Sequence, residues 1–279
     1  MITATNIFCL NELGKRANNE DCISPQKGVA TSNDRLFIVC DGVGGEKKGE
    51  VASEIVCTSI REYFKHETPV DVEEKEAIQK AIHYANDKLA MYVATDAMAK
   101  RMSTTLALVL LGRQSVIAAW CGDTRIHHIR NGKVVWKSKD HSLVSELISQ
   151  GEITEEEART HPRRNVITRS LNASNFNNNV DFHEIQDFKT GDYLLLSTDG
   201  LLEKVNENII NTILTDETEK DKAKGFLSYC DGITKDNFSM YLIKGRNITR
   251  RTRLPVSRSV LIISVLLLII IIAFFCLYT

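Results

Sequence analysis

The chain is predicted to fold as an α+β protein in which antiparallel strands form stacked sheets, with a membrane-spanning helix at its C-terminus. Three observations predict this. Short apolar runs joined by tight turns over 102–137 are typical of antiparallel sheets and not of βαβ units. Apolar residues recur three or four apart over 47–64 and 71–96, which indicates helices. Finally, residues 260–277 are almost entirely apolar.

The composition indicates a globular protein with a sizeable core. The 279 residues are 43% hydrophobic and 25% charged. The net charge of −1 hides six basic residues and no acidic one over 244–258, so the rest of the chain carries about −7. This acidic body argues against binding to nucleic acid, which needs clustered Lys and Arg. The seven scattered cysteines predict reduced thiols in a cytosolic compartment.

The first third of the chain is predicted to contain two strands. These and their polar connections are a strand over 2–13, a loop over 14–21, a turn over 28–34 and a strand over 36–41. Asp41 ends the second strand and precedes glycines at 42, 44 and 45, which allow the backbone to come close to a ligand. The helices over 47–64 and 71–96 follow, separated by a loop around Pro69.

The middle of the chain predicts a run of strands followed by a polar insertion. The strands are expected over 102–111, 115–122, 126–130 and 133–137, the last two forming a hairpin around Asn131-Gly132. The insertion over 139–170 contains a short helix over 141–150 and a capping box formed by Thr154 and Glu157. We interpret this insertion as a mobile lid, and call it the flap.

The last third returns to strands and ends in an apolar segment. The expected elements are an Asn-rich loop over 172–179, strands over 180–185 and 192–199, a helix over 201–214, an exposed charged segment over 215–224 and a strand over 235–243.

Acidic residues stand at the ends of several predicted strands. Asp41, Asp199 and Asp236 each lie where an apolar strand begins or ends, and Asp21 and Asp123 lie in comparable loops. A carboxylate beside a buried strand is costly unless it is paired or bound to a metal. The five together suggest oxygen-rich sites for Mg²⁺ or Mn²⁺.

Two adjacent metal ions can lower the pKa of a shared water and hold a phosphoryl oxygen. Arg16, in the nearby polar loop, could bind a phosphate through two hydrogen bonds, or it could be a surface charge paired with Glu20. The seven histidines are scattered apart from 127–128, and we expect them to be surface or strand residues.

Six short motifs then follow one another along residues 5–244. They are Arg16-Ala-Asn-Asn-Glu-Asp21, Asp41-Gly-Val-Gly-Gly45, Met102-Ser-Thr-Thr-Leu106, Gly122-Asp-Thr-Arg125, Ser197-Thr-Asp-Gly-Leu201 and Asp236-Asn237. In this order they resemble the PPM family, the metal-dependent Ser/Thr protein phosphatases also called type 2C. Val43 stands where animal members carry a histidine, so the resemblance is to the bacterial branch, without a histidine general acid at that position.

The resemblance implies a four-layer α/β/β/α sandwich of two antiparallel sheets flanked by helices, with two Mn²⁺ or Mg²⁺ ions in a cleft at one end. The residues that it assigns to metal binding are Glu20, Asp21, Asp41, Gly42, Asp123, Asp199 and Asp236. Asp41 would bridge both ions, and Asp123 would hold a third, weaker one. Arg16 would bind the phosphate of phosphoserine or phosphothreonine, which a metal-activated water would attack directly.

Two other interpretations remain open at this point. A non-catalytic relative would act as a membrane-held binding module, but it would be expected to lack at least one of the metal carboxylates. Alternatively, the enzyme could be a dedicated switch that acts on one anti-sigma-type partner. In that case its specificity would lie in the flap.

The chain is thus predicted to have three parts. These are a phosphatase domain over 1–244, a basic juxtamembrane linker over 245–258 and a transmembrane helix over 259–279. At ~1.5 Å per residue the last segment comes close to crossing a ~30 Å hydrocarbon core. Basic residues on its N-terminal side predict a cytoplasmic catalytic domain at the cell membrane. Expected partners are phosphorylated proteins, including a Ser/Thr kinase and its substrates. The linker either rests on anionic lipid or only sets the topology.

Overall fold

A computed structural model describes residues 1–43, 48–66, 73–174, 180–218 and 220–248 of the chain. Residues Met1–Ile248 form one compact unit. Several predictions concern residues outside the described ranges: the glycines at 44 and 45, the loop around Pro69, residues 175–179 of the Asn-rich loop predicted over 172–179, the linker from residue 249 and the transmembrane helix. In the part of the chain that is described, no helix has the length and apolar character needed to cross a bilayer.

One antiparallel sheet has five strands in the order β1-β12-β11-β7-β8. Their bounds are Ile2–Glu12 (β1), Phe238–Asn247 (β12), Tyr193–Ser197 (β11), Arg125–Arg130 (β7) and Lys133–Lys137 (β8). The first and last strands of the unit pair along almost their whole length, from Ile2 opposite Asn247 to Glu12 opposite Phe238. The N-terminal strand is therefore held in place by the end of the described chain.

The second antiparallel sheet has seven strands. Along the path β10-β6-β5-β3-β4-β9 they are Asp181–Ile185, Val116–Cys121, Leu106–Leu111, Leu36–Val43, Ser103–Thr104 and Leu171–Asn172, and β2 (Asp21–Ser24) pairs with β3. The strand predicted over 102–111 is interrupted at Thr105, giving β4 and β5. Strand β2 was not predicted, because it has only four residues and follows a polar loop.

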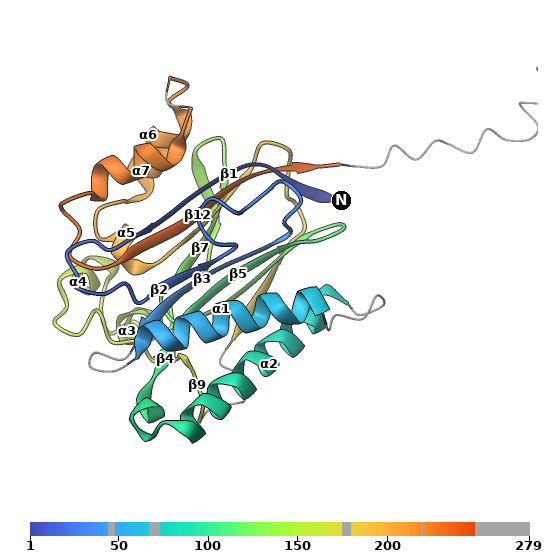
Figure 1. The fold of residues 1–279 in the computed structure, drawn as a ribbon. Helices are drawn as coiled ribbons and strands as arrows, with labels where there is room; N and C mark the ends of the chain where they lie inside the picture. Colours follow the sequence, from blue (N-terminus) through green and yellow to red (C-terminus); the bar gives the residue numbers. More distant parts are fainter. Residues whose placement is uncertain (44–47, 67–72, 175–179, 219, 249–279) are drawn as a thin grey trace, which may run out of the picture. The chain divides into compact units, whose positions relative to one another are not determined.

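Helices cover the outer face of each sheet (Figure 1). Against the seven-stranded sheet lie α1 (Gly49–His66) and α2 (Glu74–Thr95), followed by the 3-10 helix η1 (Ala97–Arg101). Against the five-stranded sheet lie α5 (Asp199–Leu202), α6 (Glu207–Thr215) and α7 (Lys222–Cys230). The single helix predicted over 201–214 is wrong, because Asn206 caps a new helix by accepting a hydrogen bond from the Ile209 amide.

The two sheets pack face to face around a buried apolar layer. Along β3, Phe37 and Val39 belong to the core between the sheets, whereas Ile38 and Cys40 belong to the core under α1 and α2. This alternation follows from the two-residue period of a strand and requires β3 to be buried on both faces. The predicted sandwich of two antiparallel sheets flanked by helices is confirmed.

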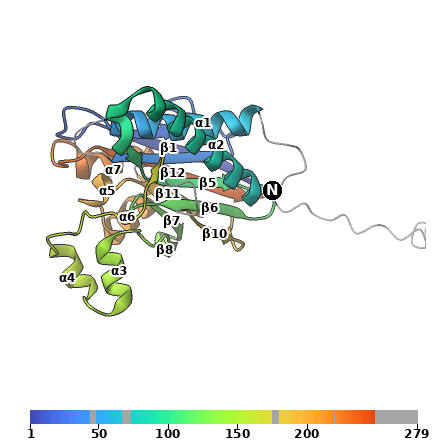
Figure 2. The same ribbon diagram turned by 90° about the horizontal axis from the view of Figure 1, so that it is seen from below.

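The flap contains α3 (Leu143–Gln150) and α4 (Glu155–Thr160), which stand to one side of the sheets (Figure 2). The predicted capping box at the start of α4 is present, with Thr154 and Glu157 each bonding the other's backbone. Ser142 caps α3, and Gly151 ends it in the left-handed conformation.

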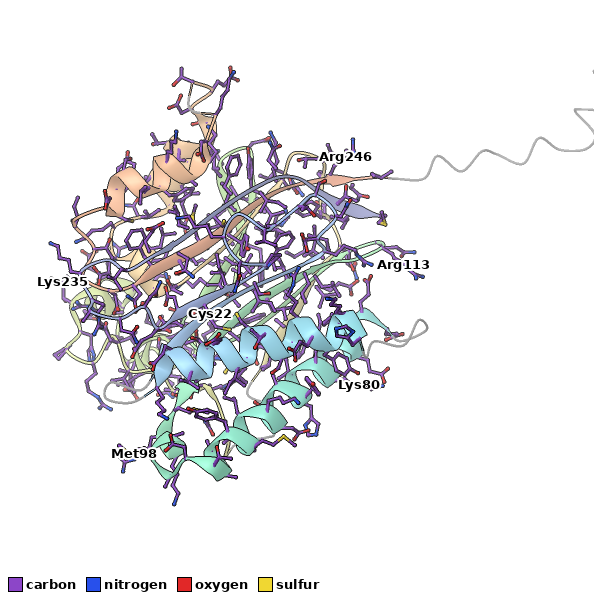
Figure 3. The ribbon with its side chains drawn as sticks, viewed as in Figure 1. Cys22, Lys80, Met98, Arg113, Lys235 and Arg246 are labelled. Carbon is purple, nitrogen blue, oxygen red and sulfur yellow. The ribbon has the colours of Figure 1, made fainter. Side chains whose placement is uncertain are left out.

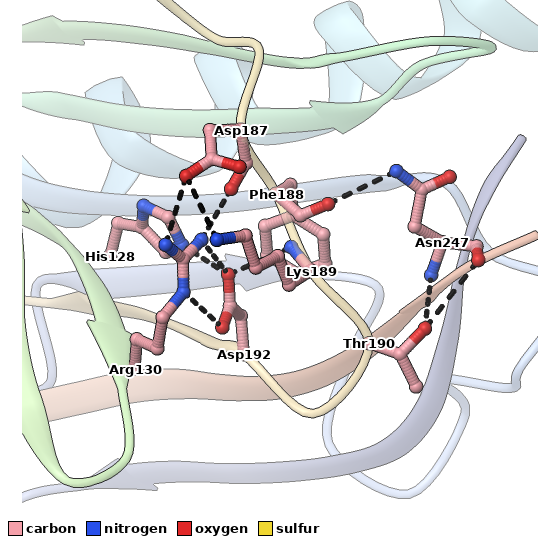
Figure 4. Close-up of polar contacts among 8 residues, drawn as sticks. All are labelled: His128, Arg130, Asp187, Phe188, Lys189, Thr190, Asp192 and Asn247. Atoms are coloured by element: carbon pink, nitrogen blue, oxygen red, sulfur yellow. Dashed lines mark hydrogen bonds and ion pairs between the residues drawn. The ribbon is translucent and has the colours of Figure 1, made fainter.

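A buried charge cluster fixes the connection between β10 and β11 (Figure 4). Asp192, predicted to be the first residue of a strand, precedes β11 and is only 2% exposed. Its carboxylate accepts hydrogen bonds from Arg130 at 2.9 and 2.7 Å and lies 2.7 Å from Nε2 of His128. Asn247 donates to the Phe188 carbonyl at 3.0 Å, which fastens the same connection to the end of β12.

Candidate active site

The predicted acidic residues meet at one end of the sandwich. Strands β3, β6 and β11 end there, and β2 and β12 begin there, as the pairings Asp21 with Asp41, Leu106 with Cys121 and Ser197 with Met240 require. In Figure 3, Lys235, which precedes Asp236, and Arg246, near the end of β12, lie at opposite ends of the unit. Antiparallel pairing has therefore brought residues from five separate stretches of the chain to one edge.

Asp21 and Asp41 are direct cross-strand partners. The Gly42 amide donates to the Glu20 carbonyl at 3.0 Å, which makes Glu20 and Gly42 a hydrogen-bonded pair. Asp21 and Asp41 consequently form a non-hydrogen-bonded pair, in which Cα atoms are only ~4.5 Å apart and side chains are closest. Two carboxylates thus face each other on the side of β3 that is turned toward the other sheet.

This arrangement is electrostatically costly. Burial raises the pKa of Asp41 well above its usual range, and Asp21 adds to the shift by repulsion. Burial likewise raises the pKa of Asp21 to about 7 and that of Asp199 to about 6, and Asp236 contributes repulsion to both. Burial and Asp199 raise the pKa of Asp123 to about 7. A nearby positive charge would relieve this repulsion.

The donor set fits a hard divalent cation, since it consists of carboxylates and backbone carbonyls. Among the described residues, however, no three His, Cys, Asp or Glu side chains already stand as a complete metal site. Asp236 is paired with a side chain, since its two oxygens accept hydrogen bonds from Nε and Nη2 of Arg16 at 2.8 and 2.7 Å. Arg16 therefore pairs with a predicted metal ligand, and the alternative that it pairs with Glu20 is wrong.

Two threonines hold the backbone of Asp41. The Asp41 amide donates to Oγ1 of Thr105 at 2.9 Å, and Oγ1 of Thr104 donates to the Asp41 carbonyl at 2.8 Å. Both threonines belong to the 102–106 motif, but this role was not predicted. At Gly42, in strand β3, a Cβ atom would lie only 2.3 Å from the backbone of Gly49, so the close approach of these two segments requires glycine.

A second group of polar side chains holds the loop that carries Arg16 and Glu20. Oδ1 of Asn237 accepts from the Glu20 amide at 2.8 Å, and its Nδ2 donates to the carbonyls of Leu13 and Asn18. Oγ1 of Thr198 donates to Oδ2 of Asp21 at 3.0 Å. Neither role was predicted, although Asn237 and Thr198 directly adjoin predicted metal ligands in the sequence.

Comparison with known proteins identifies the family. A family model described as "Protein phosphatase 2C" matches residues 13–232. This chain belongs to the protein phosphatase 2C family. The serine/threonine phosphatase stp of Listeria innocua is 33% identical over 244 residues, which covers 85% of this chain and 94% of the relative. The chain is accordingly a protein serine/threonine phosphatase with bacterial relatives, as predicted.

Solved structures of phosphatases share the fold. Stp1 from Staphylococcus aureus superposes with a TM-score of 0.74 at 30% identity, over 88% of this chain and 97% of that one. The catalytic domain of PstP, solved in complex with two manganese ions, superposes with a TM-score of 0.71 at 26% identity, over 88% of this phosphatase and all of that chain. The non-catalytic alternative predicted the loss of at least one metal carboxylate. The chain carries all five acidic residues that were singled out at strand ends, so this alternative is not supported.

Proposed function

We propose that this phosphatase hydrolyses phosphoserine and phosphothreonine in proteins with the help of two Mn²⁺ or Mg²⁺ ions. The observation that carries the proposal is the facing pair of buried Asp21 and half-buried Asp41, with further carboxylates close enough to raise their pKa values. Clusters of like charges with strongly shifted pKa values are typical of functional sites, and a cluster of carboxylates can bind divalent cations. A manganese-bound relative of the same fold supports the choice of ion.

Each residue has a proposed part in this chemistry. Asp41, Asp199 and Asp236 would hold the two ions, with the Gly42 carbonyl as a further ligand and Glu20 or Asp21 supporting bound water. When bound, the ions would supply the positive charge that lowers the pKa of a water and neutralises phosphate oxygens. Asp123 would hold a weaker third ion.

Arg16 would orient the substrate. Its guanidinium already makes two parallel hydrogen bonds to a carboxylate, and the same geometry fits two oxygens of a phosphate. Its side chain is 58% exposed and therefore accessible to a substrate.

Phosphopeptide hydrolysis by the purified full-length protein tests this function. Phosphate release should require Mn²⁺ or Mg²⁺, stop in EDTA and fall at least ~100-fold in Asp41→Asn and Asp199→Asn. Activity that persists in EDTA would contradict the two-metal proposal. A Glu54→Gln variant, changed at an exposed position on α1, should behave like the unmodified protein.

We further propose that residues 259–279 anchor the phosphatase in the cell membrane, with residues 1–244 in the cytoplasm. The support is the sequence alone: a nearly unbroken apolar segment that follows a basic stretch. The substrates would then be phosphoproteins at the membrane face, including a Ser/Thr kinase and its targets, or a single anti-sigma-type partner. Removing 259–279 should move the protein from the membrane fraction to the soluble fraction, and continued membrane association would contradict the anchor.

A further inference from the structure

His141 stands at the base of the flap and is only 5% exposed. Its ring lies between the turn that carries Asp123 and strand β10. Nδ1 accepts a hydrogen bond from the Gly122 amide at 3.2 Å, and Nε2 lies 3.1 Å from Oδ2 of Asp181. Because Nδ1 is an acceptor, the ring proton belongs on Nε2, which donates to Asp181. The ring also stacks on Trp120, at 6.3 Å between centroids.

The backbone of His141 joins the two ends of the flap. Its amide donates to the Gly122 carbonyl at 2.9 Å, and its carbonyl accepts from the Thr168 amide at 2.8 Å. Two residues on, the Leu143 amide donates to the carbonyl of Val166 at 2.8 Å. His141 therefore touches the Gly122 turn with both its side chain and its backbone, at the point where the flap leaves the domain and returns to it.

The turn at Gly122 also packs against Thr105, one of the two threonines that hold the backbone of Asp41. Gly122 has a φ of +93°, and a Cβ atom there would lie 2.6 Å from Cγ2 of Thr105. The Thr105 hydroxyl is hydrogen bonded to that of Thr124 and accepts from the Asp41 amide at 2.9 Å. A displacement of this turn would thus move Asp123 and disturb the support of Asp41.

We propose that His141 is a positioning residue that couples the flap to the carboxylate cluster, because its Nδ1 fixes the Gly122 amide and thereby the place of Asp123. The coupling itself is a statement about the fold, whereas its effect on metal binding rests on the proposed function. The neighbouring pairs at the flap base do not provide this link. Arg125 bonds Asp140, and Trp120 bonds the Lys139 carbonyl, so neither reaches the Gly122 amide.

Three substitutions separate the two ends of the imidazole. His141→Asn places an amide oxygen near the position of Nδ1 and keeps an acceptor for Gly122. His141→Gln reaches toward the position of Nε2 and loses that acceptor, and His141→Ala loses both contacts. Glu152→Gln, changed at an exposed position in the flap, serves as the control and should behave like the unmodified protein.

Amide hydrogen exchange of the full-length protein, read by mass spectrometry, tests the coupling without any metal. Peptides containing Gly122 and the flap base should exchange about tenfold faster in His141→Gln and His141→Ala than in the unmodified protein and in His141→Asn. A folded Gln variant that exchanges like the unmodified protein would overturn the proposal. An Asn variant that exchanges as fast as the Gln variant would also overturn it.

Calorimetric titration with Mn²⁺ tests the consequence for the site. The weakest Mn²⁺ site should lose about tenfold in affinity in the Gln variant and stay within about twofold in the Asn variant. Faster exchange with unchanged Mn²⁺ affinity in the Gln variant would overturn the link to Asp123. If the unmodified protein bound no Mn²⁺ at all, the proposed function would fail, and the exchange experiment would still decide the coupling.

Discussion

Arg16 is bonded to the same oxygens of Asp236 that the proposed metal ion would need. The guanidinium makes two short, parallel hydrogen bonds to that carboxylate, which are among the stronger polar contacts in proteins. Both partners are partly exposed, at 58% and 34%, so solvent screens the pair and it can open. When a metal ion bound Asp236, the guanidinium of Arg16 would be released from this carboxylate and could bind the phosphate of the substrate instead.

Replacing Arg16 should therefore have opposite effects on two ligands. In Arg16→Ala we expect the KM for a phosphopeptide to rise at least ~10-fold, because the phosphate loses a bidentate partner. The same variant should bind Mn²⁺ more tightly, because Asp236 no longer has a competing cation. Calorimetry and steady-state kinetics measure the two effects. Arg16→Lys, which keeps the charge but not the planar fork, should lie between. Weaker Mn²⁺ binding by Arg16→Ala would contradict the competition.

At the scale of strands and helices, the buried carboxylate of Asp192 ties the connection between β10 and β11 to strand β7. Asp192 meets Arg130 and His128 from β7, while its neighbours Phe188 and Thr190 are held by Asn247 at the end of β12 (Figure 4). Three strands of the five-stranded sheet are thereby tied together at the end away from the active site. Removing one partner of a buried ion pair leaves the other charge without compensation.

Asp192→Ala should lower the free energy of unfolding by about 3–5 kcal/mol. Urea denaturation of the metal-free protein measures this change. Asp187→Ala is a matched control, because Asp187 also pairs with Arg130 but its side chain is 72% exposed. We expect that change to cost less than ~1 kcal/mol. If both variants lost the same free energy of unfolding, the contribution of the Asp192 ion pair would not depend on its burial, which would contradict this prediction.

Across the whole molecule, the active-site end carries repulsion that the rest of the fold must offset. The pKa values of Asp21 and Asp123 rise to about 7 on folding, and that of Asp199 to about 6, from an ordinary 3.8. The folded protein therefore binds more protons than the unfolded chain from about pH 4 to about pH 8. It follows that the metal-free protein loses stability as pH rises through this window.

Lowering the pH from 8.5 to 6.5 in EDTA should consequently stabilise the protein, by about 1–2 kcal/mol or a few degrees in Tm. The window stops at pH 6.5 because buried histidines oppose the effect below it. Burial lowers the pKa of His127 from 6.5 to about 4. As the pH falls, this histidine is therefore protonated in the unfolded chain before it is protonated in the folded protein, which destabilises the fold. Thermal denaturation measures the effect. Asp41→Asn should raise the Tm in EDTA at pH 8.5 and flatten the pH dependence, and a Tm that falls between pH 8.5 and 6.5 would contradict this account.

Much of the fold was predictable from local patterns. The strands over 2–13, 126–130 and 133–137 and the helices over 47–64 and 71–96 were found close to their observed bounds, because their apolar periods are long or their turns are distinctive. The predictions failed at two elements, one because of a local helix cap and one because of a pairing with a distant strand. The helix over 201–214 breaks at the Asn206 cap, and β2 exists because it pairs with β3.

The sequence by itself determined the family and singled out the acidic residues to which the chemistry is assigned, since each follows or precedes an apolar strand and the motifs stand in a fixed order. Only the tertiary structure decided which of them meet. That Asp21 faces Asp41, that Arg16 holds Asp236 from 220 residues away, and that His141 bonds Gly122 all depend on strand register and loop packing. These contacts join segments that are far apart in the chain, and no local periodicity encodes a partner at that distance.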